Sequence, residues 1–127
     1  MAELLFDTNV LIDHLHGVKE ANELIISVEE GRITGYISTL TEVELFAGKE
    51  VENPRIRELV AELTDLFCKV EPGSTIARLA GEFRRRYNVK LADAVIAATA
   101  ADTGYKLLTK NLSDFKNIRE IVAEEPY

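Results

Sequence analysis

The chain has 127 residues, of which 46% are hydrophobic and 29% are charged, and its formal net charge at pH 7 is -7. A chain of this length and apolar content can bury a core as one domain, which excludes intrinsic disorder. The excess of 22 acidic over 15 basic side chains argues against binding nucleic acid by surface charge alone. Enzymes that act on nucleic acid through clustered carboxylates and a divalent metal ion remain open.

Cysteine and histidine are scarce in this chain. Cys68 is the only cysteine, so an intrachain disulfide and a cysteine-based zinc site are excluded, and we expect a small buried residue there. His14 and His16 are the only histidines, so a histidine-centred mechanism is poorly supplied. Glu3 and Asp7 stand where a signal peptide has a basic region, and no apolar run reaches membrane-spanning length. We therefore expect a cytoplasmic protein without a membrane segment.

The first half of the chain opens on a short apolar run and continues with apolar residues at helical spacing. Gly17, Gly31 and Gly48 each follow a helical pattern and end it, and Ser38 is suited to cap the third helix. In chain order, the predicted elements are a strand at residues 4–6, helices at 10–16 and 19–30, a strand at 33–37, and a helix that ends at residue 47.

The second half repeats this alternation. Pro54 follows Asn53, and proline is tolerated at the first position of a helix, while Gly104 closes an alanine-rich helix. In chain order, the predicted elements are a helix at residues 54–66, a strand at 67–70, helices at 74–86 and 90–103, a strand at 106–109, a turn or single helical turn at 111–115, and a last strand at 118–123.

Strands that alternate with helices indicate an α/β protein with a parallel sheet. We expect residues 1–127 to form one three-layer α/β/α domain around a mainly parallel sheet of about five short strands. In open α/β sheets, ligands bind beyond the carboxyl ends of the strands. Asp7 follows the first strand directly and so stands where chemistry is usually done, although a lone aspartate there also suits a helix cap.

Acidic residues recur beside predicted strand ends and on otherwise apolar helices. They are Asp7, Glu42 and Glu44, Asp93, and Asp114. Asp93 is the most informative, since it is the only charge between Lys90 and Asp102. A charge near the start of such a helix must complement the helix dipole, pair with another group or bind a metal.

Several carboxylates at one edge of a sheet repel one another, and a hard cation offsets that repulsion. Mg²⁺ and Mn²⁺ take carboxylate and water oxygens, and a pair of such ions clamps the attacking and leaving oxygens of a phosphodiester. The scarcity of cysteine and histidine fits an oxygen-ligated metal better than zinc.

Four motifs, in order along nearly the whole chain, carry a resemblance to a known family. They are Phe6-Asp7-Thr8-Asn9-Val10-Leu11-Ile12-Asp13, Ile37-Ser38 leading to Glu44-Leu45-Phe46-Ala47-Gly48, Leu91-Ala92-Asp93-Ala94-Val95-Ile96-Ala97-Ala98, and Leu108-Thr109-Lys110-Asn111 with Asp114-Phe115. The chain resembles PIN-domain proteins, and closely resembles the VapC family of toxin ribonucleases. Each motif alone is of moderate specificity, and together they are strong.

The resemblance implies an Mg²⁺-dependent endoribonuclease, with Mn²⁺ as a substitute, whose metal is held by acidic residues. Carried over, the metal ligands and catalytic residues are Asp7, Glu44, Asp93 and Asp114. Glu44 rather than Glu42 matches the acidic helix position of the family, because it stands four residues before Gly48; helical periodicity alone does not separate the two. Asn111 stands where many relatives have aspartate, so Asp114 is expected to supply the missing carboxylate.

The resemblance also implies supporting residues and partners. The residues expected to orient carboxylates or water are Thr8, Asn9, Thr109 and Asn111. The candidates for contacts with RNA phosphates are Arg84, Arg85 and Arg86. A basic helix C-terminus or a solvated face also explains these arginines. The expected partners are an RNA substrate, a small antitoxin protein whose tail covers the acidic groove, and a second copy of the chain.

Three other classes were weighed against this one. A phosphohydrolase with an aspartate nucleophile needs a second aspartate two residues on, where Asn9 stands. A phosphoacceptor regulatory domain needs adjacent acidic residues early in the chain and a lysine before a proline late, and Lys106 precedes Leu107 instead. A PIN-like module that only binds a partner or RNA stays open, because Asn111 lacks a charge.

Overall fold

A computed structural model describes residues 2–127 and contains one five-stranded sheet in the order β3-β2-β1-β4-β5, in which every neighbouring pair is parallel. The strands are β1 (Ala2–Phe6), β2 (Ile33–Ser38), β3 (Cys68–Val70), β4 (Lys106–Leu108) and β5 (Ala123–Glu124). The α-helices are α1 (Thr8–Leu15), α2 (Lys19–Glu29), α3 (Thr39–Phe46), α4 (Pro54–Asp65), α5 (Ser74–Tyr87) and α6 (Leu91–Thr103). The 3₁₀-helices are η1 (Lys49–Glu52) and η2 (Leu112–Asp114).

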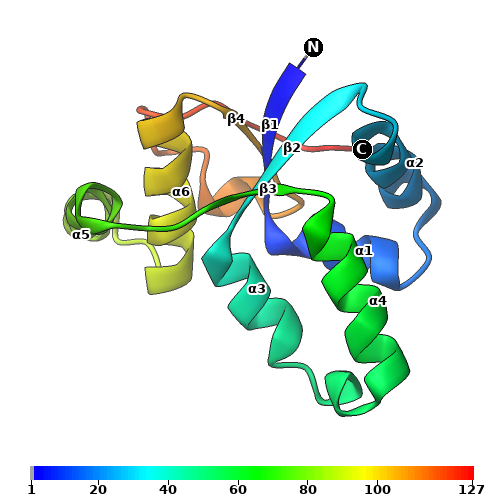
Figure 1. The fold of residues 1–127 in the computed structure, drawn as a ribbon. Helices are drawn as coiled ribbons and strands as arrows, with labels where there is room; N and C mark the ends of the chain where they lie inside the picture. The colour runs from blue at the N-terminus through cyan, green and yellow to red at the C-terminus, as the bar shows by residue number, and fades with distance from the viewer. Residues whose placement is uncertain (1) are drawn as a thin grey trace.

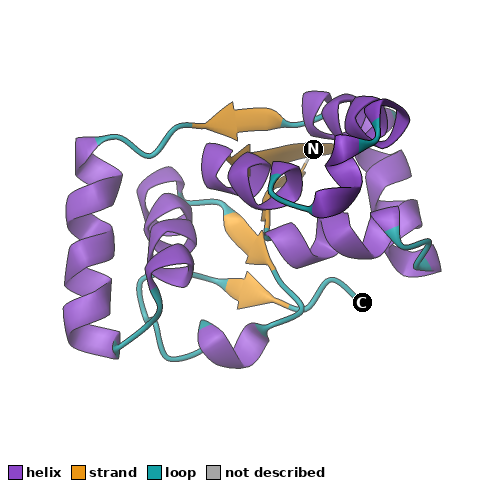
Figure 2. Cartoon of the chain, turned by 90° about the horizontal axis from the view of Figure 1, so that it is seen from below, coloured by secondary structure: helices purple, strands orange, loops and turns teal. Residues whose placement is uncertain are grey.

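The helices cover both faces of the sheet, which confirms the predicted three-layer α/β class. Figures 1 and 2 show α5 and α6 on one side of the sheet and α1 to α4 on the other. Successive strand residues point to opposite faces, and the two cores follow that alternation. Leu5 and Leu107 pack with α5 and α6, whereas Phe6 and Leu108 pack with α1 to α4.

In Figure 1, β1 and β2 run downward and α1 and α3 begin below them, so Figure 2, seen from below, views the sheet from the side of their carboxyl ends. The backbone amide of Asp7 donates to the carbonyl of Leu108 at 2.9 Å, which joins the ends of β1 and β4. The helices α1 and α3 begin directly after β1 and β2, with Asp7 and Ser38 at their N-cap positions. This edge therefore gathers the polar residues that follow β1, β2 and β4.

Two sequence-based predictions about individual residues are wrong. The strand predicted at 118–123 is absent apart from Ala123, because Ile118 lies in a turn, where its amide donates to the Phe115 carbonyl at 3.0 Å and its side chain fills the core beside α6. Cys68 is exposed rather than buried, because it lies on β3 at an edge of the sheet.

No helix within residues 2–127 combines the length and the apolar character needed to cross a membrane.

The sheet offers one test of the packing. A Cβ atom built at Gly35 on β2 would lie 2.7 Å from two ring carbons of the buried Phe67. Gly35→Ala is therefore expected to lower the free energy of unfolding by about 1–3 kcal/mol, because the buried ring must shift. Gly81 on α5 has no heavy atom within 4 Å of its built Cβ, so Gly81→Ala serves as the matched control and should add about 0.5–1 kcal/mol. Urea unfolding measures both; equal effects at the two sites would contradict the packing argument.

Candidate active site

The side chain of Asp7 is buried, with 8% of the residue exposed, and it is held by hydrogen bonds on both carboxylate oxygens. The amide of Thr8 donates to Oδ1 at 2.9 Å. The hydroxyl of Thr109 donates to Oδ2 at 2.8 Å, and the Asn9 amide group donates to the same oxygen at 3.2 Å. Asp7 is thus both the N-cap of α1 and an oriented carboxylate, so the two explanations of this residue coexist.

Glu44 is brought beside Asp7 by Thr8. The Thr8 hydroxyl lies 2.6 Å from a Glu44 carboxylate oxygen and 3.0 Å from the Thr41 hydroxyl. Because a carboxylate can only accept, Thr8 donates to Glu44 and its oxygen is left to accept from Thr41. Glu42 instead forms an ion pair with Lys69 at 3.0 Å. The structure therefore separates the two glutamates that helical periodicity left equivalent.

The loop after β4 is tied to the same network. The Lys110 amide donates to the side-chain oxygen of Asn9 at 3.1 Å, and the Asn111 amide donates to the Thr109 hydroxyl at 3.0 Å. Three of the predicted supporting residues, Thr8, Asn9 and Thr109, thus contact Asp7 directly. Asn111 takes part through its backbone, and its side chain is exposed to solvent.

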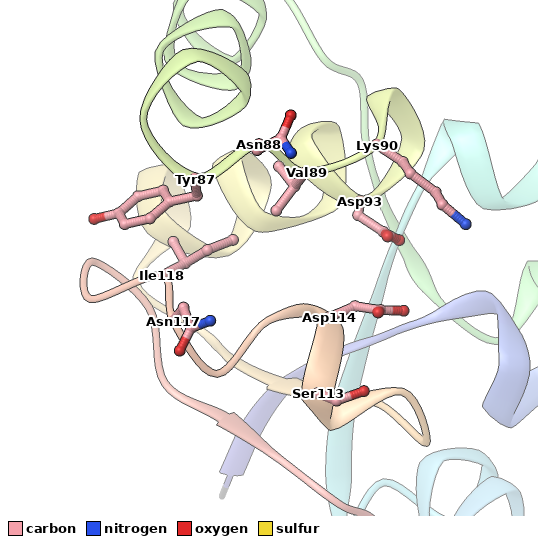
Figure 3. A pocket seen from close by; sticks show the side chains of 9 residues that line it. All are labelled: Tyr87, Asn88, Val89, Lys90, Asp93, Ser113, Asp114, Asn117 and Ile118. Atoms are coloured by element: carbon pink, nitrogen blue, oxygen red, sulfur yellow. The ribbon is translucent and has the colours of Figure 1, made fainter.

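Asp93 and Asp114 complete the acidic group. Asp93 lies in the first turn of α6 and is partly buried, whereas Asp114 ends η2 and is exposed. Figure 3 shows the two carboxylates facing each other from α6 and η2 at one end of a cavity. Neither carboxylate is paired with a cation in an ion pair within residues 2–127.

Burial and mutual repulsion disfavour the charged forms of two of these carboxyls. Burial is the main cause that raises the pKa of Asp7, Glu44 adds to it, and the hydrogen bonds from Thr109, Thr8 and Asn9 oppose it. Burial also raises the pKa of Asp93 most, followed by the charges of Asp114, Asp7 and Glu44, and Lys90 opposes the shift. The four predicted acidic residues therefore act on one another as one electrostatic cluster.

The donor set of this cluster suits a hard divalent cation. All four side chains offer carboxylate oxygens, and neither histidine nor cysteine takes part. Within residues 2–127, no three acidic, histidine or cysteine side chains converge as a ready-made metal site. Mg²⁺ keeps several waters and is commonly bound through one or two carboxylates, so the residues fit that ion.

The three arginines predicted to contact RNA lie at the end of α5. The Arg86 guanidinium pairs with Glu82 at 2.9 Å and Glu120 at 2.6 Å, and the Arg84 side chain donates to the Val89 carbonyl at 3.3 Å. These contacts hold Arg84 and Arg86 to their own chain. The RNA role of Arg84, Arg85 and Arg86 remains a prediction without a supporting contact.

Sequence reasoning missed two residues of the site. Thr41 is fully buried and its hydroxyl meets that of Thr8; the available signal was its position three residues before Glu44 on the same helix. Lys90 precedes α6, and its charge favours the ionised form of Asp93. A cation three residues before a helical aspartate was the signal for it.

The PIN domain family matches residues 4–121 of this chain. Ribonuclease VapC10 of Mycobacterium tuberculosis is 32% identical over 126 residues, which span 93% of this chain and 90% of that protein. Ribonuclease VapC1 of Rickettsia felis is 35% identical over 115 residues, which span 76% of this chain and 86% of that protein. The chain therefore belongs to the VapC ribonucleases of the PIN-domain family.

Solved structures agree with this assignment. A chain of a toxin-antitoxin complex from Klebsiella pneumoniae is 30% identical, with a TM-score of 0.81 over 98% of each chain. A chain of the DNA-bound VapBC complex from Salmonella typhimurium has a TM-score of 0.85 over 100% of each chain. At 23% identity, this second likeness supports the fold alone.

The raised pKa of Asp93 predicts how stability depends on pH. Because the folded state takes up this proton more readily than the unfolded state, ionised Asp93 destabilises the fold, and the cost disappears as the pH falls through the folded-state pKa. Asp93→Asn is therefore expected to raise the free energy of unfolding of the metal-free protein at pH 7, and the gain should shrink at acidic pH. Urea unfolding in EDTA over a pH series measures this.

The matched control for this test is Glu58→Gln, at an exposed position of α4 outside the cluster. It should leave the pH dependence of unfolding unchanged. Mg²⁺ should then stabilise the parent more than Asp93→Asn, since an ion that binds only the folded state raises its stability. Equal stabilisation of the two proteins by Mg²⁺ would show that Asp93 does not bind the ion.

Proposed function

We propose that this protein is an Mg²⁺-dependent endoribonuclease and the toxin of a VapBC-type pair. The observation that carries the proposal is the buried, hydrogen-bonded carboxylate of Asp7 at the carboxyl edge of the sheet. Glu44 joins the same hydrogen-bond network through Thr8, and the charges of Asp114, Asp7 and Glu44 act on Asp93. The relatives named ribonuclease VapC support the activity. The mutual repulsion of the carboxylates supports a bound divalent cation.

The residues that would hold the metal are Asp7 and Asp93, with Glu44 and Asp114 beside them. When bound, the ion lowers the pKa of a water molecule and stabilises charge that develops on the phosphodiester. Thr109 and Asn9 fix the orientation of Asp7 through the bonds to its Oδ2. Hydrolysis by water leaves 5′-phosphate and 3′-hydroxyl ends, so products with 2′,3′-cyclic phosphates would contradict the proposal.

The cluster gives a test of catalysis with an internal control. Asp7→Asn, Asp93→Asn and Glu44→Gln are each expected to lower the cleavage rate of a structured RNA pool by roughly 100-fold or more, because each removes a charge that would hold the metal or stabilise charge in the transition state. Glu42→Gln should retain the parent rate, because Glu42 pairs with Lys69 away from the site. Gel assays with Mg²⁺, Mn²⁺ and EDTA measure the rates.

Cleavage that resists EDTA, or full activity in Asp7→Asn and Asp93→Asn, would overturn the role of the cluster. The absence of both cleavage and divalent-ion binding in a metal titration would favour the alternative, a PIN-like module that only binds a partner or RNA. The uncharged Asn111 is the residue that keeps this alternative open.

A small antitoxin and a second copy of the chain are the proposed protein partners. An apolar groove of about 440 Å³ begins beside Glu44 and lies between α1, α3, η1 and α4. Ile12 and Leu59 line it and are 37% and 50% exposed. An apolar helix face suits such a groove, and a basic side chain at its end would reach the acidic cluster. The solved toxin-antitoxin complex from Klebsiella pneumoniae supports a partner of this class.

Leu59→Asp tests the groove. An antitoxin that silences the parent is expected to neutralise this variant roughly 100-fold more weakly, because the new charge would have to be buried against an apolar helix face. Ile26→Asp is the matched control, since Ile26 on α2 is 47% exposed and lies outside the groove. RNA cleavage during antitoxin titration measures both. Equal neutralisation of Leu59→Asp and Ile26→Asp would place the antitoxin elsewhere.

A further inference from the structure

A second cavity, of about 230 Å³, opens directly beside Asp93 and Asp114. It lies between the turn that joins α5 to α6 and the segment that follows η2, as Figure 3 shows. Asp93 and Asp114, two of the candidate metal ligands, form part of its lining, so the cavity adjoins the proposed metal site. The apolar groove described above has a different lining, in which neither aspartate takes part.

The lining combines apolar side chains with polar ones, and two of the polar side chains have no hydrogen-bond partner within residues 2–127. Val89, which is partly buried, supplies most of the apolar surface, and Ile118, which is only 2% exposed, adds little from the opposite segment. Ser113 and Asn117 also line the cavity, and within residues 2–127 neither side chain takes part in a hydrogen bond. By contrast, the polar side chains around Asp7 are hydrogen-bonded to one another. The hydrogen-bonding capacity of this cavity is therefore available to a ligand.

Lys90 is the one cation among the described residues that line the cavity. It forms no ion pair within residues 2–127, and its charge acts on Asp93. In a protein with a net charge of -7, an unpaired lysine beside a carboxylate cluster is a specific feature. Because Lys90 is not held in an ion pair with any one carboxylate, its ammonium group is available to contact a phosphate that enters the site.

This combination matches an unpaired nucleotide. Proteins that recognise single-stranded RNA place a base against apolar or aromatic side chains and form hydrogen bonds with its edge. An asparagine amide offers a donor and an acceptor side by side, which is the pattern that base edges present. A lysine supplies the contact with the charged backbone.

We infer that this cavity binds one unpaired nucleotide of the RNA adjacent to the cleaved bond. Val89 contacts the base, Asn117 forms hydrogen bonds with its edge, and Lys90 contacts a neighbouring phosphate. The inference rests on the proposed ribonuclease function and deepens it, because it assigns base preference to a site separate from the carboxylates.

The first experiment needs no catalysis. The four nucleoside 5′-monophosphates are titrated into the parent protein in EDTA and followed by NMR. One base is expected to shift the signals of residues 88–90 and 113–118 more than the other three do. Asn117→Ala should weaken that binding about tenfold, since a bidentate contact with a base is worth about that factor. Lys116→Ala is the matched control, because Lys116 is exposed on the same loop and does not line the cavity.

The second experiment sequences the cleavage sites in a random RNA pool. The parent should prefer one base next to the cut, Asn117→Ala should lose that preference, and Lys90→Ala should raise KM with the preference intact. Lys116→Ala should change neither. Unchanged cleavage sites in Asn117→Ala, together with no base-dependent shifts at the cavity, would overturn the inference and leave the ribonuclease proposal standing. Base-selective binding without any RNA cleavage would support the site and contradict the proposed function.

Discussion

The buried carboxylate of Asp7 is the constraint on which the site depends. The carboxylate loses most of its hydration at a position only 8% exposed, and hydrogen bonds from Thr8, Asn9 and Thr109 compensate for part of that loss. Thr109 lies 102 positions along the chain, so the ends of β1 and β4 must meet for this compensation to exist. The pKa of Asp7 is nevertheless raised, which shows that the hydrogen bonds do not offset the burial completely.

The parallel sheet explains why the energetic cost of burying carboxylates is concentrated at one edge. Each strand runs in the same direction, so the residues that follow β1 and β4 meet there, and α3 carries Glu44 to the same place after β2. Successive side chains such as Leu5 and Phe6 point to opposite faces of the sheet, and both faces are therefore packed in hydrophobic cores. The polar residues therefore lie at the edge of the sheet, where burial and mutual repulsion of charges lower the stability of the fold. Functional sites commonly carry such a cost.

The sequence predicted the α/β class, the order of the helices and four of the five strands, because short apolar runs and helical periodicity are local signals. It failed where distant contacts decide the outcome. Ile118 has the same apolar character in a turn as in a strand, and only its packing beside α6 distinguishes the two. Glu42 and Glu44 are equivalent in periodicity, and Lys69 on a neighbouring strand removes Glu42 from the site. The grouping of Asp7, Glu44, Asp93 and Asp114 was carried by the family resemblance, since no local pattern reveals which carboxylates approach one another.

The carboxylates of the cluster have no cationic partner in the part of the chain that the structure describes. Glu42 and Glu120 have cationic partners at 3.0 Å and 2.6 Å, whereas Asp7, Glu44, Asp93 and Asp114 form no ion pair within residues 2–127. Unlike exposed carboxylates without a partner, Asp7 and Asp93 are also buried or partly buried and are repelled by neighbouring carboxylates. A divalent ion and a basic side chain of a partner would each relieve the same repulsion, so they compete for the same electrostatic gain. If the proposed function holds, an antitoxin would not need to reshape the fold to silence the protein, because a positive charge placed at the cluster would lower its affinity for the proposed metal ion.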